Sequence, residues 1–499
     1  MNGTNGSWAF WGLFLIALSA GACSEDAGGL GIFDESVDIG DAAHPGSARF
    51  DRESGRYFVS GSGANIWGER DAFHFLWRRI GGDLQLTAEV EFPDAGGHPH
   101  RKAGWMVRES LEPDAPYADA VVHGDGLISL QYRKETGGPT EEIQAHQTAP
   151  ATLRLERAGD LFSLYISSNG GPFQPVGSIL VEVGESPHVG LAVCSHEQDR
   201  MQEAVFSRVS VESRSLPEGA ERVVESTLEV INVESGERTV RRREKDHFEA
   251  PNWSRDGSYF VINRHGLLYR IDVDGGEPIQ IDTGKLIRNN NDHGFSPDGK
   301  WLAISDHTEQ GASLIYVVPA GGGEPRLITA QGPSFWHGWS PDGKTLAYCA
   351  ERNGQYDVYA IPAEGGRERQ LTNTAGLDDG PDYSPDGDIF FNSERTGSMK
   401  IWRMSADGGN PTQMTFDQDY ADWFPHPSPD GRHVIFLSYD RSVEGHPPNQ
   451  EVALRIMPLE GGQPTVLARF YGGQGTINVP SWSPDSRHAA FVSFRLVIP

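Results

Sequence analysis

Hydrophobic and polar residues alternate along much of the first half of the chain. The alternation is clear in FHFLWRRI from Phe73, LQLTAEVEF from Leu84 and ATLRLERAG from Ala151, with glycine, proline, asparagine and aspartate between such runs. A period of two is typical of strands that bury one face. Residues 28–213 are therefore predicted to form two packed antiparallel sheets, a β-sandwich of the jelly-roll kind. The polar segment RSLPEGAER, residues 214–222, is expected to be a linker.

After this linker, residues 223–499 show an internal repeat. The turn sequence WSPDG and its variants recur six times, with the serine at Ser254, Ser296, Ser340, Ser384, Ser428 and Ser483. The first four intervals are 42, 44, 44 and 44 residues, and the last is 55. A second turn, usually Gly-Gly, follows in each of the first five units. Such a period with four short strands per unit predicts a β-propeller of six blades, so the whole chain is expected to be all-β.

The repeat also predicts how the ring closes. The sixth unit has room for only two strands after Trp482, and the two missing strands precede the first unit, as STLEVINV and ERTVRR within residues 226–242. We expect these segments to complete the last blade, which would remove the free sheet edges. Pro, Asp and Gly in the repeated turn each favour a tight turn, and the aromatic residue before the serine is expected to pack between neighbouring blades.

These motifs resemble known families. The WSPDG and Gly-Gly repeat resembles the TolB-like six-bladed propeller repeat, which is also found in peptidase propellers and some polysaccharide lyases. The alternating strands before it resemble the concanavalin-like, laminin-G-like sandwiches of secreted bacterial proteins. The resemblance implies fold more strongly than function, because propellers host many chemistries. TolB itself carries a different N-terminal domain, so its role in the Tol system does not transfer directly.

The first 23 residues carry an export signal by their composition. An apolar run starts at Trp8, and small residues precede Cys23, so residues 1–23 resemble a lipoprotein signal peptide with Cys23 as the lipidated residue. No Lys or Arg precedes the run, and Ala20 stands where Leu is usual. The sequence therefore predicts a periplasmic or extracellular protein that meets the membrane only through a lipid anchor. Cys194 and Cys349 are expected to be buried thiols without a disulfide framework.

The formal net charge of −28 disfavours nucleic-acid binding, because such a field repels phosphates. It favours neutral or cationic ligands over anionic ones. No HExxH, paired CxxC, GxSxG or P-loop motif is present to indicate an enzyme class.

Candidate chemistry in the propeller lies on its variable face, formed by the connections between blades and the hairpins between second and third strands. Three residues before the serine, four blades have proline, whereas two adjacent blades have His293 and His337. These imidazoles are candidates to bind a ligand or a divalent metal, or to act as a general base and its orienting partner. Channel hydrogen bonding alone is the plainer alternative. The same segments contribute the further ligand-binding candidates Asp292, Trp336, Asp379, Asp422, Trp423 and His426. The fifth hairpin is enlarged, residues 439–455, and could overhang the channel mouth.

The sandwich supplies a second candidate site. Alternation places Arg108 on one strand face and Gln131 and Arg133 on the polar face of another strand, and His123 lies in VVHGDG near Asp125. If they point to one concave surface, these side chains would suit hydroxyl or carboxylate recognition. Trp67, Trp77 and Trp105 could stack on sugars, although core packing is the more usual role of tryptophan. HPHRK, residues 98–102, is expected to be a solvated hairpin tip.

Two functions remain open. In the first, the protein is an exported, envelope-associated binding protein, with a glycan-binding sandwich and a propeller that binds a protein or glycan at its channel mouth. In the second, it is a secreted carbohydrate-active enzyme, a polysaccharide lyase or glycoside hydrolase, with a histidine–carboxylate or metal site in the channel.

Overall fold

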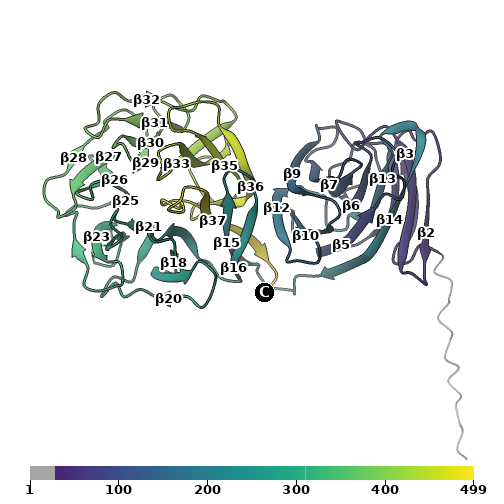
Figure 1. The fold of residues 1–499 in the computed structure, drawn as a ribbon, viewed down its shortest axis with the longest axis horizontal. Coiled ribbons are helices and arrows are strands. Elements are labelled where there is room, and N and C mark those ends of the chain that lie inside the picture. The colour runs from purple at the N-terminus through teal and green to yellow at the C-terminus, as the bar shows by residue number, and fades with distance from the viewer. Residues whose placement is uncertain (1–28, 310) are drawn as a thin grey trace, which may run out of the picture.

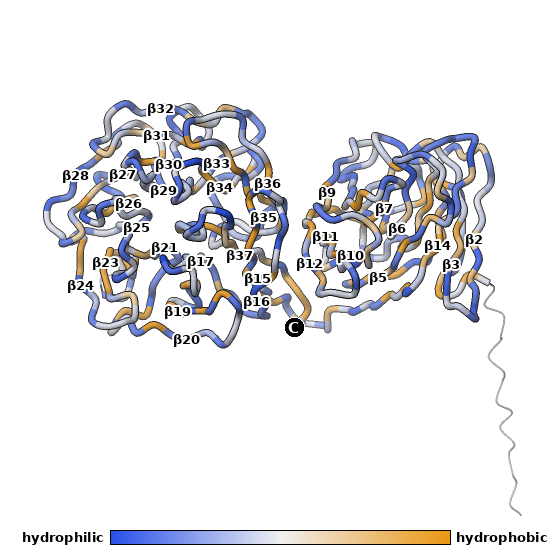
Figure 2. Tube along the Cα trace, viewed as in Figure 1, coloured by the Kyte–Doolittle hydropathy of each residue, from blue (hydrophilic) through white to orange (hydrophobic). Residues whose placement is uncertain are grey.

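The structure is a computed structural model that describes residues 29–309 and 311–499, and in these residues the secondary structure is entirely β. Figure 1 shows two parts side by side, a two-sheet region formed by the first part of the chain and a ring of blades formed by the rest. Hydrophobic and hydrophilic residues alternate along several strands, as along β14 in Figure 2. In the described part of the chain, no helix has the length and apolar character to cross a membrane. Cys23 and the predicted signal segment lie outside the described residues.

The N-terminal part consists of two seven-stranded antiparallel sheets. The first sheet has the order β1 (Glu35–Ile39), β4 (Phe73–Arg79), β13 (His188–Cys194), β6 (Lys102–Arg108), β7 (Tyr117–His123), β8 (Leu127–Arg133) and β9 (Glu141–Thr148). The second has the order β12 (Gln174–Leu180), β11 (Leu161–Ser167), β10 (Thr152–Ala158), β5 (Asp83–Glu91), β14 (Glu197–Arg214), β3 (Arg56–Gly63) and β2 (Ser47–Asp51). Each alternating run noted in the sequence lies largely on a strand.

One hydrophobic core joins the two sheets. Trp105 and Leu130 enter it from the first sheet, and Leu86, Leu155 and Leu164 enter it from the second. All five are fully buried; every second residue is buried along β5 and β10, whereas nearly every residue is buried along β6, β8 and β11. Burial of a large apolar side chain contributes about 1.5–3 kcal/mol, which makes this core the main stabilising element of the region.

The C-terminal part is a propeller, and its first five blades each contain four antiparallel strands. Blade 1 contains β17 (Glu249–Trp253), β18 (Tyr259–Arg264), β19 (Leu267–Asp272) and β20 (Ile279–Gln280). Blade 2 contains β21 (Asn289–Phe295), β22 (Trp301–Asp306), β23 (Leu314–Pro319) and β24 (Arg326–Leu327). Blade 3 contains β25 (Ser334–Trp339), β26 (Thr345–Arg352), β27 (Gln355–Pro362) and β28 (Arg369–Gln370). Blades 4 and 5 contain β29 (Asp378–Tyr383), β30 (Ile389–Ser393), β31 (Lys400–Met404) and β32 (Thr412–Gln413); and β33 (Tyr420–Pro427), β34 (His433–Asp440), β35 (Pro448–Pro458) and β36 (Thr465–Gly473).

The sixth blade closes the ring as the sequence predicted. Strand β15 (Val223–Asn232) lies between β16 (Arg238–Glu244) and the last strand, β37 (His488–Val497). The pairing of β15 with β37 runs without a register shift from Val223 opposite Val497 to Asn232 opposite His488. A single bridge between Trp482 and Ala489 marks the innermost position. The first segment of the propeller is therefore bonded to the last.

The repeated turn has the same hydrogen bond in all six blades. The serine hydroxyl donates to the aspartate two residues later, for example from Ser340 to Asp342 at 2.7 Å and from Ser483 to Asp485 at 2.6 Å. The aromatic residue before the serine also reaches the neighbouring blade, because Trp339 Nε1 donates to the Gly294 carbonyl at 3.1 Å. The turn sequence therefore recurs because each blade needs the same hydrogen-bonded turn between its first two strands.

The two parts of the chain contact each other through sheet edges. In Figure 1, β12 lies beside β15, β16 and β36, and β12 packs against both β16 and β36. Arg238 on β16 is buried, forms a two-bond ion pair with Glu229, and donates to the Val176 carbonyl on β12 at 3.0 Å. Gly236 permits this approach, since it has a φ of +71° and an added Cβ would lie 2.2 Å from His146 Nε2.

Candidate functional site at the mouth of the propeller channel

A cavity of about 540 Å³ lies on the face where the blade connections and the second-to-third-strand hairpins gather. All six blades contribute to it, the sixth through the segment that follows β36, and its lining is Glu249, Asn290, Asn291, Asp292, His307, Phe335, His337, Cys349, Tyr356, Leu377, Asp379, Phe424, His446, Gln474 and Asn478. This is the variable face that the sequence singled out. Of the propeller residues proposed from the sequence, Asp292, His337 and Asp379 line this pocket.

The pocket contains a histidine held beside a carboxylate. His337 Nε2 lies 3.2 Å from Asp379 Oδ1, and both side chains are almost fully buried. Burial alone would lower the pKa of His337, but the hydrogen bond and the charge of Asp379 raise it. Burial opposes ionisation of Asp379 as well, yet His337 and His446 hold the pKa of that carboxyl well below its usual range. The contact with Asp379 therefore favours the protonated form of His337, and the contact with His337 favours the ionised form of Asp379. His337 Nδ1 is buried and has no hydrogen-bond partner among the described residues.

Asp292 behaves differently from Asp379. Burial raises the pKa of Asp292 to about 7, and the charges of Asp379 and Glu249 add to this effect, although His337 opposes it. Asn290 Nδ2 donates to its carboxyl group at 2.6 Å. The pocket thus contains one carboxylate that is fixed in its ionised form and one carboxyl that can release a proton in the physiological range.

His293 does not join His337 in this pocket, although the sequence suggested a pair of neighbouring imidazoles. Its Nε2 lies 3.2 Å from the carbonyl of Val261 in the preceding blade, and its side chain is fully buried. The reason is a shift in strand register. The irregularity in β21 ends at His293, which pairs with Ile304, whereas in β25 it falls between Trp336 and Gly338 and leaves His337 as the extra residue. Burial lowers the pKa of His293 to about 4, so it is neutral at pH 7.

The remaining propeller candidates lie outside the pocket and have other contacts. Asp422 accepts from Ser438 Oγ at 2.6 Å and pairs with Arg455 at 3.2 Å. His426 Nδ1 lies 3.1 Å from Asp382, and its Nε2 lies 2.9 Å from the Ile477 carbonyl. Trp336 and Trp423 are 1% exposed and belong to hydrophobic clusters of the blades. Among the described residues, no group of three or more His, Cys, Asp or Glu side chains is arranged to hold a metal ion.

Several pocket residues were not predicted from the sequence. His446 comes from the enlarged fifth hairpin, and its ring centroid lies 5.1 Å from that of Phe424 and 4.4 Å from that of Trp423, in edge-to-face geometry. The insertion therefore does reach the channel mouth, as its length suggested. Phe335 and Tyr356 add half-buried aromatic surface. The period of the repeat carries no signal for these side chains, because they come from segments that differ between blades.

The sandwich candidates share one face of the first sheet, but this face is covered. Tyr117 lies opposite both Arg108 and Arg133 in the strand register, which confirms the alternation. Arg133 binds Asp71 through two bonds of 2.8 Å, and Arg108 Nη2 lies 3.5 Å from the same carboxylate. All three side chains are fully buried. The expectation of an exposed concave binding surface at these arginines is wrong, because the segment carrying Asp71 packs over the sheet.

The other two sandwich candidates are also inaccessible. His123 is 4% exposed and Gln131 is 0% exposed, and His123 Nε2 lies 3.1 Å from Ser129 Oγ. Burial, together with the nearby Lys102 charge, lowers the pKa of His123 to about 4. Trp77 and Trp105 are buried, whereas Trp67 is 39% exposed.

The segment HPHRK is only partly the solvated tip that the sequence suggested. Arg101 and Lys102 are buried, and Lys102 Nζ donates to the Ile66 carbonyl at 2.7 Å. The two histidines of the segment gather with two others: ring centroids are 4.2 Å apart for His98 and His196, 5.5 Å for His98 and His100, and 6.3 Å for His100 and His123.

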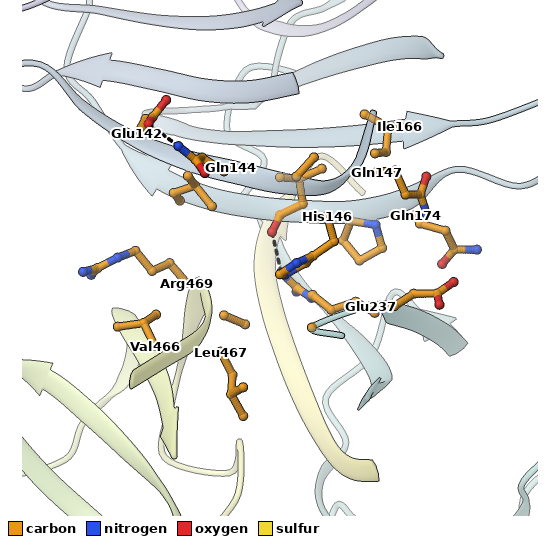
Figure 3. Close-up of a pocket in the computed structure, with 17 residues that line it drawn as sticks. Glu142, Gln144, His146, Gln147, Ile166, Gln174, Glu237, Val466, Leu467 and Arg469 are labelled. Carbon is orange, nitrogen blue, oxygen red and sulfur yellow. Dashed lines mark hydrogen bonds between the residues drawn. The ribbon is translucent and has the colours of Figure 1, made fainter. Parts of the chain in front are cut away.

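A second cavity, of about 240 Å³, lies where the two parts of the chain meet. Figure 3 shows Gln144 and His146 on β9 and Gln174 on β12 on one side of it, with Glu237 and Arg469 of the propeller on the other. Ile143, Val176 and Ala468 add apolar surface. The cavity is smaller than the channel-mouth pocket and contains fewer ionisable groups with shifted pKa values.

Comparisons with known proteins identify the family to which the propeller is similar. The family model of the TolB β-propeller domain matches residues 332–446. The uncharacterized protein Atu1656 of Agrobacterium fabrum is 47% identical over 271 residues, which are 54% of this chain and 92% of that protein. A solved structure described as a candidate TolB from Agrobacterium tumefaciens is also 47% identical, with a TM-score of 0.54 over 56% of this chain and 100% of its own. TolB from Acinetobacter baumannii is 16% identical over 64% of this chain and 79% of its own, with a TM-score of 0.38. By its similarity to relatives matched over almost their whole length, the chain belongs to the family of TolB-like six-bladed β-propeller proteins.

Proposed function

We propose that this protein is an exported, envelope-associated binding protein whose propeller binds a glycan or a protein segment in the channel-mouth pocket. The observation that carries the proposal is the composition of that pocket. Three carboxyl groups and three imidazoles line one cavity of about 540 Å³, together with aromatic and amide side chains. Ligand sites are typically cavities of this size with apolar walls and a few convergent polar groups.

The pocket also has the electrostatic character of a site that is completed by a ligand. An unpartnered buried nitrogen such as His337 Nδ1 costs free energy, on the order of 1–3 kcal/mol, unless water or a ligand satisfies it. The repeat supplies proline at this position in other blades, so the histidine is not required for the architecture. A ligand that accepts or donates a hydrogen bond here would recover this free energy.

For the N-terminal region we propose a concanavalin-like sandwich that contributes to glycan recognition. Because Arg108 and Arg133 are buried, the proposed surface lies further out, at Trp67. This tryptophan is 39% exposed, and Lys102 Nζ lies 5.1 Å from its ring centroid. An exposed indole offers a flat apolar face for a sugar ring. Export, with lipid attachment at Cys23, is proposed from the apolar N-terminal segment and the small residues before this cysteine.

One observation favours the enzymatic alternative. A buried carboxyl group with a pKa of about 7, as for Asp292, is suited to general acid or base catalysis. Asp379 is ionised and lies beside His337, on the first strand of the next blade. It could then stabilise a positive charge that develops on the substrate. In this alternative the substrate would be a polysaccharide, and turnover would depend on the Asp292 proton.

A ligand panel tests both proposals. The full chain is screened by thermal shift against neutral, uronic-acid and amino glycans and against peptides, with and without a chelator, while product formation is followed through reducing ends and unsaturated sugars. A ligand of the pocket should stabilise the native chain and the His433→Ala control on the opposite rim, but should stabilise His446→Ala much less. If no compound depends on the pocket residues, the binding proposal fails. Turnover that is lost in Asp292→Asn would replace the binding proposal with the enzymatic one.

A further inference from the structure

We propose that the channel-mouth pocket selects a carbohydrate that carries a free, protonated amino group. This inference rests on the proposed function and makes its ligand class specific. It follows from three properties of the pocket that point to the same chemistry: an acidic lining without a compensating side chain of fixed positive charge, aromatic walls, and amide side chains.

The charge of the lining favours a cation. Glu249, Asp292 and Asp379 contribute carboxyl groups, whereas no Lys or Arg is among the residues that line the cavity. His337, at 3.2 Å, is the ion-pair partner of Asp379, and the charge of His446 also acts on this carboxylate, but no side chain of fixed positive charge lines the pocket to balance Glu249 and Asp292. A uronic acid would add a further negative charge to a low-dielectric site and is disfavoured. An ammonium group would instead complete the charge balance.

The walls favour a ring with apolar faces over a linear amine. Phe335 and Tyr356 expose part of their rings to the cavity, and Phe424 forms a further side of it. The rings of His337 and Phe424 lie nearly parallel, with centroids 6.1 Å apart, and His446 stands edge-on to Phe424 at 5.1 Å. Aromatic surfaces of this kind bind the C–H faces of a pyranose and attract a nearby cation.

The amides supply hydroxyl recognition. Asn290, Asn291, Asn478 and Gln474 line the cavity beside the carboxylates. Asn478 Nδ2 donates to Gln474 Oε1 at 3.1 Å, and Asn478 Oδ1 accepts from the Gly475 amide at 2.7 Å, so the orientation of Asn478 is fixed. Side chains held in one orientation lose little entropy when they bind hydroxyl groups. The hydroxyl groups of an amino sugar could use the remaining hydrogen-bonding capacity of these amides, whereas a simple alkyl amine has no hydroxyl groups to do so.

The protonation of Asp292 offers a measurement that reports on the charge of the ligand: the number of protons released on binding. Its carboxyl faces His337 from β25, Asp379 from β29, Glu249 from β17 and Asn290 from its own strand, and Lys and Arg are absent from the pocket lining. A bound ammonium group would favour its ionised form, and the proton would leave to solvent. Binding of the cation should therefore release close to one proton at pH 6, and binding of a neutral sugar should release none.

The experiment compares two ligands with the same sugar backbone, which differ in whether the amino groups are free or N-acetylated. Isothermal titration at pH 6, in buffers of different ionisation enthalpy, measures affinity and proton release for the β-1,4-linked glucosamine tetramer and for its fully N-acetylated form. We expect the glucosamine tetramer to bind at least about tenfold more tightly, since hydrogen bonds to charged groups are worth roughly this much. Asp379→Asn and Asp292→Asn should each lower its affinity about tenfold, whereas Asp274→Asn, the same charge change at an exposed turn on the other rim, should not.

Other outcomes overturn the inference in distinguishable ways. Equal or tighter binding of the N-acetylated tetramer would refute the amino-group selectivity but leave a glycan-binding pocket. Tetralysine binding as tightly as the glucosamine tetramer would refute the carbohydrate part. A pocket that takes other ligands from the panel but neither tetramer would refute the inference while the proposed function stands. Absence of any pocket-dependent ligand would refute both.

Discussion

Replacement of Asp71 by alanine should strongly destabilise the N-terminal region. The Asp71 carboxylate is fully buried and compensates two buried guanidinium groups, with bonds of 2.8 Å to Arg133 and a distance of 3.5 Å to Arg108. Removing one partner of a buried ion pair leaves an uncompensated charge and typically costs about 3–5 kcal/mol. Here two cations lose their common partner, so we expect a loss in the upper part of that range. A domain is stable by only about 5–15 kcal/mol, so a large share of its stability would be lost.

Hydrogen exchange measured by mass spectrometry under increasing urea can assign this loss to one part of the full chain. Peptides from β6 and β8, which carry Arg108 and Arg133, should lose protection at lower urea in Asp71→Ala, while the propeller peptides of the same molecule serve as internal controls. Glu53→Gln, at an exposed position in the turn between β2 and β3, should leave both parts unchanged.

The double variant Asp71→Leu/Arg133→Met should recover part of the stability, because it removes one of the two charges that the loss of Asp71 leaves uncompensated. A loss below about 1 kcal/mol in Asp71→Ala would refute the reasoning. It would mean that water reaches Arg108 and Arg133, and that these arginines could contact a ligand after all.

Three further predictions concern the propeller. Deletion of residues 226–241 removes most of β15 and the beginning of β16, so the cooperative unfolding transition of the ring should disappear, as measured by calorimetry. His337→Asn should lower the melting temperature most at pH 6 and below, and progressively less at higher pH. The pKa of His337 is raised in the folded state, so its ion pair with Asp379 stabilises the protein fully below a pH of about 6.5. This stabilisation is lost as the pH rises through the folded-state pKa. Gly294→Ala should cost about 1–3 kcal/mol in urea denaturation, since the new Cβ would lie 2.2 Å from Trp336 Cη2; an unchanged midpoint would show that the indole can move aside.

The sequence predicted the architecture of the propeller well because the repeat is strict. Serine and aspartate at fixed spacing define each turn, glycine follows them in five of the six, and the missing strands of the last unit have only one place to come from. The pocket was predicted less well. His337 and His293 occupy equivalent places in the repeat, but a one-residue difference in the position of the irregularity directs one side chain to the pocket and the other to Val261.

In the N-terminal region, the alternation of polar and apolar residues correctly predicted which sheet face carries Arg108 and Arg133, but not that this face is buried. Arg108 and Arg133 do lie on the polar face of one sheet. What covers that face is the segment with Asp71, which has no periodic pattern and is far from the arginines in sequence. Its docking depends on a long-range ion pair, and local sequence carries little information about such contacts. His446 was missed for a related reason, because the length of an insertion does not fix which of its side chains points inward.

The pairing of β15 with β37 has a consequence for the order in which the propeller folds. Strand β15 is the first strand of the propeller and pairs along its whole length with β37, so five blades lie between the two partners in the sequence. Until β37 is in place, one edge of β15 has no hydrogen-bonding partner, and contacts of such high sequence separation form slowly. Closure of the ring is therefore expected to be a late step in folding, after the individual blades have formed.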